Sequence, residues 1–171
     1  MDNEAKDKVA KGIAEAMRTE NDGRYFYLMA AKSTQDAKGQ KVFQSLADEE
    51  AEHLKYLKRQ YLSLVERGEF DKRLKLGHPG DFSGTNPIFS DEIIERLGEA
   101  HFEMTALSVG VKLELFAMSF YKQQADQSDD PFVKGFFNEL VEWEKGHYRA
   151  LLTQLDSLKE FYWQKAGFAP F

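Results

Sequence analysis

The chain has 171 residues, of which 42% are hydrophobic and 30% charged, a composition and length that fit one soluble domain with a sizeable core. A net charge of -6 argues against nucleic acid as a partner, and without an apolar run of about 18 residues or a signal-peptide core we expect a cytoplasmic protein with no membrane contact. Cysteine is absent, which excludes disulfides, thiolate catalysis and cysteine-ligated metals.

The first half of the chain predicts a helical hairpin. Apolar residues recur with helical spacing over about 7–37 and again over about 41–67. The short stretch around Gly39 supplies the break, and Gly68 is a typical C-terminal glycine for the second helix. Because the break is short, we expect the two helices to be antiparallel.

The second half predicts another hairpin of the same kind. Ser90, followed by two acidic residues, opens a helix that runs to about residue 126. Asp130 is the expected N-cap of the last helix, with Pro131 at its first position, and this helix extends to about residue 162. The connection is again short, so these two helices are also expected to be antiparallel.

A segment rich in glycine and proline, residues 69–89, joins the hairpins. Its roughly 20 residues can extend to about 65 Å, whereas a helix of about 27 residues is only about 40 Å long. The segment can therefore return along the whole bundle and place the third helix parallel to the second. The sequence thus predicts an all-α fold in which residues 1–171 form one domain, with one long crossover between helices 2 and 3.

The two halves, about 7–67 and 90–162, repeat one pattern at an offset of 94 residues, reading ENDGRYFY…FQSLADEEAEH and ELFAMSFY…FNELVEWEKGH. Each half has a glutamate, a tyrosine seven positions later, and a Glu-x-x-His motif whose glutamate lies 30 positions after the first. Two such motifs at one common offset are difficult to explain by chance. The matching positions are Glu20 and Glu114, Tyr27 and Tyr121, Glu50 and Glu144, and His53 and His147.

These spacings place the repeated groups on common helix faces. Residues three apart lie about 60° around the helix axis and about 4.5 Å along it, so Glu50 and His53 can reach the same point. Residues seven apart, such as Glu20 and Tyr27, share one face within about 20°. Folding each hairpin brings its first glutamate opposite its Glu-x-x-His pair, and a two-fold axis between the hairpins would bring both sets together.

Four carboxylates and two imidazoles in a bundle core require cations, because buried carboxylates otherwise repel one another and take up protons. Two divalent metals would balance the carboxylates, and this ligand set is that of di-iron and di-manganese bundles. Oxygen-rich sites with some imidazole suit iron or manganese. We therefore expect two metal ions, iron, manganese or a mixed pair, with zinc as a redox-inactive alternative, bound by Glu20, Glu50, His53, Glu114, Glu144 and His147.

The repeated E-x6-Y and E-x-x-H pattern resembles the ferritin-like superfamily and, within it, the rubrerythrin family, over about 7–158. The resemblance implies a ferritin-like four-helix bundle in which Glu50 and Glu144 bridge the metals. It implies terminal ligands at Glu20 and Glu114 and one histidine on each metal. It also implies a cytoplasmic di-iron peroxidase or ferroxidase, active on hydrogen peroxide or dioxygen with oxidation of Fe(II), and we expect a homodimer.

The sequence departs from rubrerythrins proper in two features. Those proteins have a rubredoxin-like FeS4 module, which the cysteine-free chain cannot build, so the resemblance implies an external, rubredoxin-like electron donor. They also carry an additional glutamate three residues after the third-helix ligand, where this chain has Ala117. The site thus resembles a symmetric six-ligand version. Iron storage in a ferritin-like shell and a dimanganese catalase are the alternative functions.

Other residues have two readings each. Tyr27 and Tyr121 either hydrogen-bond ligand carboxylates or act beside the metals, as the resemblance suggests, or they only pack in the core. Glu103 lies on the face of Glu114 but about 16 Å away, and is expected to be a structural or channel residue. We expect surface or packing roles for His78 and His101. Ligating imidazoles normally donate their other N–H, and Glu49 and Glu142 are two possible acceptors between which the sequence does not decide. Core or dimer-surface roles are expected for Phe136, Phe137, Trp143, Phe161, Tyr162 and Trp163.

Overall fold

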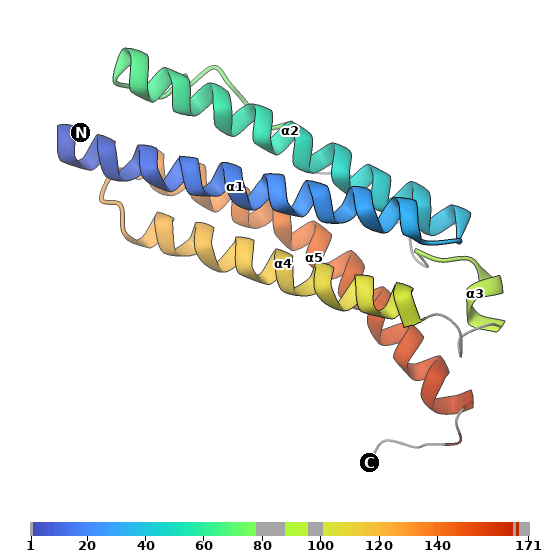
Figure 1. The fold of residues 1–171 in the computed structure, drawn as a ribbon. Coiled ribbons are helices and arrows are strands. Elements are labelled where there is room, and N and C mark those ends of the chain that lie inside the picture. The colour runs from blue at the N-terminus through green and yellow to red at the C-terminus, as the bar shows by residue number, and fades with distance from the viewer. Residues whose placement is uncertain (1, 78–87, 96–100, 166, 168–171) are drawn as a thin grey trace.

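A computed structural model describes residues 2–77, 88–95, 101–165 and 167, and every regular element in these ranges is a helix (Figure 1). This confirms the all-α prediction. Within the same ranges, no helix is both long enough and apolar enough to span a bilayer. The long helices are α1 (Asn3–Ser33), α2 (Ala37–Arg67), α4 (His101–Asp126) and α5 (Pro131–Lys165), and the short α3 (Asp91–Glu95) precedes α4.

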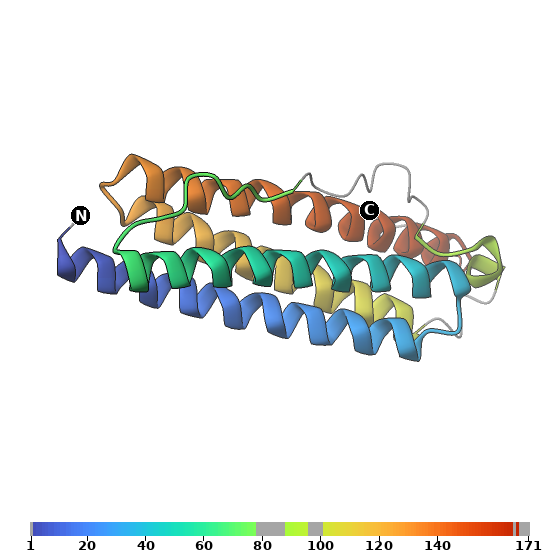
Figure 2. The same ribbon diagram turned by 90° about the horizontal axis from the view of Figure 1, so that it is seen from above.

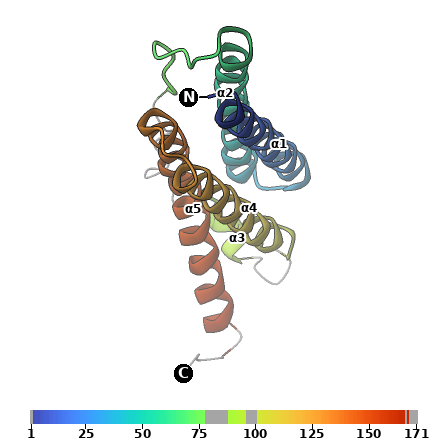
Figure 3. The same cartoon turned by 90° about the vertical axis from the view of Figure 1, so that its left-hand side faces the viewer.

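The long helices form two antiparallel hairpins, α1–α2 and α4–α5, and α1 also packs against α4 (Figure 1). Seen along the bundle, the two hairpins lie side by side as two layers (Figure 3). Helices α2 and α4 run in the same direction, and α3 lies at the end of the bundle opposite the C-terminus of α2 (Figure 2). The C-terminus of α2 and the start of α3 therefore lie at opposite ends of the bundle (Figure 2).

The break between the first two helices lies at residues 34–36, so the prediction of a break at Gly39 is wrong. Thr34 ends α1 in an extended conformation, and Asp36 is the N-cap of α2, with its Oδ1 accepting a hydrogen bond of 2.7 Å from the Gly39 N–H. Gly39 itself lies inside α2, where a Cβ atom would overlap the ring of Phe89. Close packing, and not a turn, requires the glycine.

The third predicted helix, from Ser90 to about residue 126, corresponds to two described helices, α3 and α4 (Figure 1). Phe89 is buried and packs against Phe43, with ring centroids 6.0 Å apart. Ser90 donates hydrogen bonds to Asp36 Oδ2 from its hydroxyl and from its N–H. These contacts hold the start of α3 against the α1–α2 turn. The predicted ends at Gly68 and Asp130 are confirmed as the C-cap of α2 and the N-cap of α5.

Replacing Asp36 with alanine is expected to lower the free energy of unfolding by about 2 kcal/mol at pH 7, because the variant loses the α2 cap and the bonds to Ser90. Burial alone raises the pKa of Asp36, but the hydrogen bonds from Ser90 and Gly39 outweigh it and hold the pKa below its ordinary value. The stabilisation is therefore complete above about pH 4 and is lost as the pH falls through the lower pKa of the folded state.

Urea unfolding at pH 7 and in acid measures this difference. Asp36→Asn keeps a neutral acceptor at the cap and is expected to lose less stability than Asp36→Ala. Equal unfolding midpoints for wild type and Asp36→Ala at pH 7 would contradict the assignment.

The core consists of two apolar clusters, one on each side of the bundle's midpoint. One contains Tyr27 stacked on Phe43 with ring centroids 6.4 Å apart, and the other contains Tyr121 stacked on Phe137 at 6.5 Å. These pairs occupy matching positions of the repeat, so the packing repeats with the sequence.

Aromatic residues of α5 divide between core and surface. Phe136, Phe137 and Trp143 are buried, which confirms their core role. Phe161 and Tyr162 lie in the last turns of α5, which diverge from the other helices (Figure 3), and are 42% and 43% exposed. A dimer surface at this end of the helix stays a prediction.

Candidate metal centre

Six ionisable side chains from the four long helices meet in the middle of the bundle. Each is at most 3% exposed, so they are not the solvated charges of outer helix faces. All six are the residues that the repeat predicted. They are Glu20 from α1, Glu50 and His53 from α2, Glu114 from α4, and Glu144 and His147 from α5.

The six residues form two overlapping groups, each able to hold a metal ion. In each group the ligand atoms, one per residue, all lie within 4.8 Å of one another. Glu50 and Glu144 belong to both groups, which is the position that bridging ligands require. The first group adds Glu20 and His53, and the second adds Glu114 and His147.

Both histidines direct Nδ1 toward the carboxylates. His53 Nδ1 lies 3.0 Å from Glu20 Oε2 and 3.2 Å from Glu144 Oε1. His147 Nδ1 lies 3.2 Å from both Glu50 Oε1 and Glu144 Oε2. The two rings are nearly parallel, with an interplanar angle of 17° and centroids 5.8 Å apart. Each Nδ1 therefore lies where a cation held by the neighbouring carboxylates would need a nitrogen ligand.

The buried carboxyl and imidazole groups of this cluster shift one another's pKa values. Burial and then the nearby carboxylates raise the pKa of Glu20 and of Glu114. Burial alone would lower the pKa of both histidines, but the surrounding glutamates raise it well above the ordinary value.

The shared glutamates behave in the opposite way. Burial raises the pKa of Glu50 and Glu144, but hydrogen bonds and the adjacent imidazoles outweigh it and hold both below the ordinary value. Glu20, Glu114 and both histidines thus hold protons more tightly than the free groups do, whereas Glu50 and Glu144 hold them less tightly. Two divalent cations would supply positive charge to the buried carboxylates in place of protons.

The second ring nitrogens of the two histidines have different surroundings. His147 Nε2 lies 3.1 Å from Glu49 Oε2, so of the two possible partners Glu49 is the one that faces a histidine of the cluster. Glu142 is exposed and pairs with Lys145 at 3.1 Å. The Glu142 side chain lies on the outer face of α5. The next residue, Trp143, faces inward and makes a T-shaped contact with His53, with ring centroids 4.7 Å apart.

Each buried tyrosine donates a hydrogen bond to a glutamate of the other hairpin. Tyr27 on α1 donates to Glu114 Oε1, and Tyr121 on α4 donates to Glu20 Oε1. Burial raises the pKa of both phenols, which therefore remain donors. Sequence spacing places Glu20 and Tyr27 on one face but about 10 Å apart along the axis, so the tyrosine reaches the facing helix. Both tyrosines combine core packing with carboxylate binding.

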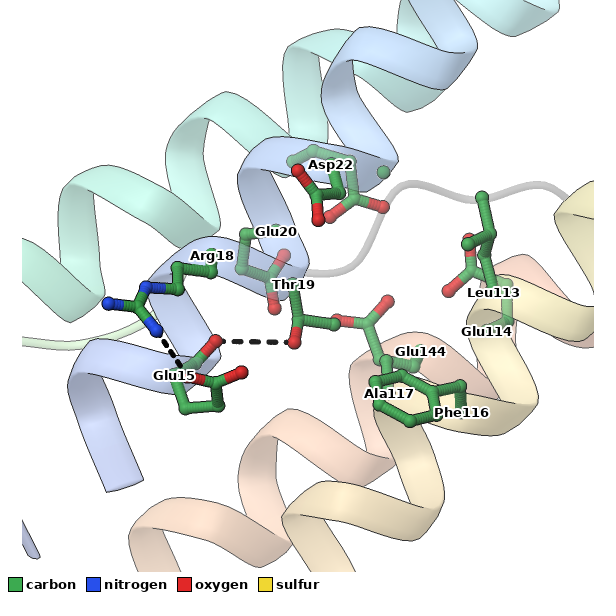
Figure 4. Close-up of a pocket in the computed structure, with 12 residues that line it drawn as sticks. Glu15, Arg18, Thr19, Glu20, Asp22, Leu113, Glu114, Phe116, Ala117 and Glu144 are labelled. Atoms are coloured by element: carbon green, nitrogen blue, oxygen red, sulfur yellow. Dashed lines mark hydrogen bonds and ion pairs between the residues drawn. The ribbon is translucent and has the colours of Figure 1, made fainter. Parts of the chain in front are cut away.

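A cavity of about 240 Å³ between α1 and α4 leads from the surface to the cluster (Figure 4). Its inner end is lined by the four glutamates, and exposed Arg18 and Phe116 lie at its outer end. Sequence reasoning missed this cavity. The available signal was a small residue three positions after each first glutamate, Gly23 and Ala117, since both line the cavity and leave room beside the carboxylates.

The remaining candidates lie away from the cluster. Glu103 is buried and accepts a hydrogen bond of 2.8 Å from Thr34 Oγ1, in line with the structural role that its distance predicted. His101 is exposed at the start of α4, in agreement with a surface role. His78 lies outside the described residues. Comparison with protein families, with curated proteins and with solved structures gave no match, so the chemistry of this site rests on its own geometry.

Proposed function

We propose that the protein is a di-iron oxidoreductase of the rubrerythrin type that reduces hydrogen peroxide or dioxygen in a ferritin-like bundle. The observation that carries this proposal is the pair of buried ligand groups that share Glu50 and Glu144. The common direction of α2 and α4 supports the ferritin-like crossover between the hairpins (Figure 2). The match between the sequence repeat and the geometry of the site supports two cations in place of one.

The donor set fits two iron ions. Both carboxylate oxygens of Glu144 are fully buried, and each lies 3.2 Å from an imidazole Nδ1 without forming a well-aligned hydrogen bond in the described part of the chain. A cation between these groups would bind the oxygens and remove the cost of burying them poorly paired. Glutamates with imidazole suit iron or manganese. One ion would be held by Glu20 and His53, the other by Glu114 and His147, with Glu50 and Glu144 bridging. Bound Fe(II) would supply the electrons for the reduction.

The protein's own groups would position the reactants and hold protons. The cavity between α1 and α4 is large enough for a peroxide or dioxygen molecule beside several waters, each of which takes about 30 Å³. Tyr27 and Tyr121 would hold Glu114 and Glu20 in place by hydrogen bonding while keeping their own protons. With no cysteine for an FeS4 module, the electrons would return from an external, rubredoxin-like donor.

Metal analysis followed by peroxide addition tests the proposal. Protein purified without chelators or added metal is expected to contain iron. The metal-free chain, loaded anaerobically with two equivalents of Fe²⁺, is expected to oxidise it on addition of peroxide faster than free iron reacts. Glu50→Ala removes a ligand from both groups and should abolish the acceleration, whereas Glu52→Ala, an exposed change on the same helix, should retain it.

Three outcomes would overturn this proposal. Oxidation no faster than that of free iron would exclude the enzymatic role. Two manganese ions with oxygen evolution from peroxide would indicate a catalase. A large shell on size exclusion that retains many irons per chain would indicate storage, whereas the proposal predicts a homodimer.

A further inference from the structure

The repeat is broken at the position before each shared glutamate. Glu49 precedes Glu50 on α2, and Trp143 precedes Glu144 on α5, at the same offset of 94 residues. Each of these side chains contacts the ligand histidine of the other hairpin, since Glu49 lies against His147 and Trp143 against His53. An acidic group and an indole thus occupy equivalent places beside the two halves of the centre.

On the Glu49 side, the carboxylate of Glu49 accepts a hydrogen bond from His147 Nε2, the ring nitrogen that faces away from the proposed cation position. The distance from His147 Nε2 to Glu49 Oε2 is 3.1 Å, and the imidazole is 1% exposed while the carboxylate is 21% exposed. Such a bond fixes the tautomer whose Nδ1 can bind a metal, fixes the ring orientation and raises the basicity of the ligand. The carboxylate retains contact with water and avoids the full cost of burial.

On the Trp143 side, the corresponding nitrogen, His53 Nε2, has no acceptor in the part of the chain that the structure describes. His53 Nε2 is buried and without a hydrogen-bond partner among the described residues, and the ring meets Trp143 at an interplanar angle of 81°. An indole can donate a hydrogen bond but cannot accept one at its nitrogen, and an N–H against an aromatic face is a weak contact. When Nδ1 of His53 binds a cation, Nε2 must carry the proton, and that proton lacks a strong acceptor.

We infer that the two cation positions are inequivalent, with Glu49 a positioning residue that makes the His147 group the tighter of the two. The inference rests on the proposed two-cation centre. The first cation binds among Glu114, Glu144 and His147, and the second binds in the group of His53. Partners of this kind change metal affinity by about 10–100-fold, and the two positions differ on that scale.

Titration of the metal-free full-length chain with Co²⁺, followed by calorimetry and visible absorption, tests this inference. Binding of Co²⁺ in two separate steps would not by itself show that the positions differ. A bound cation repels a second one, so two equivalent positions would also fill in two steps. Glu49→Ala distinguishes the cases. If the positions are inequivalent, the first step weakens about 10–100-fold and the second changes little. If they are equivalent, the first cation moves to the unaffected position, and only the second step weakens.

Matched variants complete the test. Glu49→Gln keeps a neutral acceptor and is expected to recover part of the first step, and exposed Glu52→Ala is expected to leave both steps unchanged. Trp143→Glu gives His53 an acceptor and is expected to strengthen the second step, whereas Trp143→Phe is not. If circular dichroism shows that Trp143→Glu does not fold, the two Glu49 variants decide the question.

The experiment distinguishes failure of this inference from failure of the proposed two-cation centre. Two bound cations with an unchanged first step in Glu49→Ala would overturn the inference and leave the proposed centre intact. Failure of the wild-type chain to bind two Co²⁺ ions would overturn the proposed centre itself, and the inference with it.

Discussion

Loading the metal-free protein anaerobically with Fe²⁺ is expected to raise its free energy of unfolding by about 4 kcal/mol when free Fe²⁺ is at about 1,000 times its dissociation constant. The ligands meet only in the folded chain, because they come from four helices that span most of the sequence. Cation binding therefore adds directly to folding stability. For a chain of this length the melting temperature should rise by about 8–16 °C.

The variant that best tests this expectation is Glu50→Ala, because Glu50 belongs to both ligand groups. Most of the rise in melting temperature on addition of Fe²⁺ should disappear in this variant. Glu20→Ala removes a ligand from one group only and should keep part of the rise. Glu52→Ala, with its side chain in solvent, should show the full rise. Scanning calorimetry with and without Fe²⁺ measures all four proteins, and coincident melting of metal-free and loaded wild type would refute cation binding in the core.

Tyr27→Phe and Tyr121→Phe are each expected to lower the free energy of unfolding by about 1–3 kcal/mol, the cost of leaving a buried acceptor without its donor. Phenylalanine keeps the buried ring and its stacking, so the loss reports the hydroxyl alone. The hydroxyl of each tyrosine donates to a buried glutamate of the opposite hairpin, and in the variant that glutamate oxygen loses its donor. Because the two positions match in the repeat, the two losses should be similar.

Urea unfolding of the metal-free proteins measures these losses. Tyr25→Phe is the control, because Tyr25 lies on the same helix as Tyr27 but is 60% exposed, and its stability should equal that of wild type. If Tyr27→Phe and the control unfold at the same urea concentration, the bond to Glu114 contributes nothing to stability.

The six residues of the buried cluster could be predicted from the sequence because their signal is local and repeated. The Glu-x-x-His spacing places two ligands on one helix face, and helical geometry alone requires it. The tyrosine partners could not be predicted, since they depend on how one hairpin is shifted along the other. The same is true of Glu49 and Glu142, which are equally good candidates in sequence, although only Glu49 faces a ligand histidine.

The misplaced helix break has a similar origin. Gly39 resembles a turn residue in sequence, but it lies in α2 because Phe89, 50 positions later, packs against its backbone. Thr34 and Asp36 provide the actual break through side-chain hydrogen bonds that a glycine-based reading overlooks. Ala117 and Gly23 line the cavity because these small residues leave space where α1 and α4 face each other, and this space can be seen only when the two helices are placed together.

The contrast between Glu49 and Trp143 has a consequence for how this protein can be built. Two identical hairpins that associated as separate chains could supply the same six ligands, but they would place the same residue beside both histidines. A different neighbour for each histidine requires that the halves be encoded separately within one polypeptide. Covalent linkage therefore does more than hold the halves together, because it lets a duplicated unit specialise one side of a shared centre independently of the other.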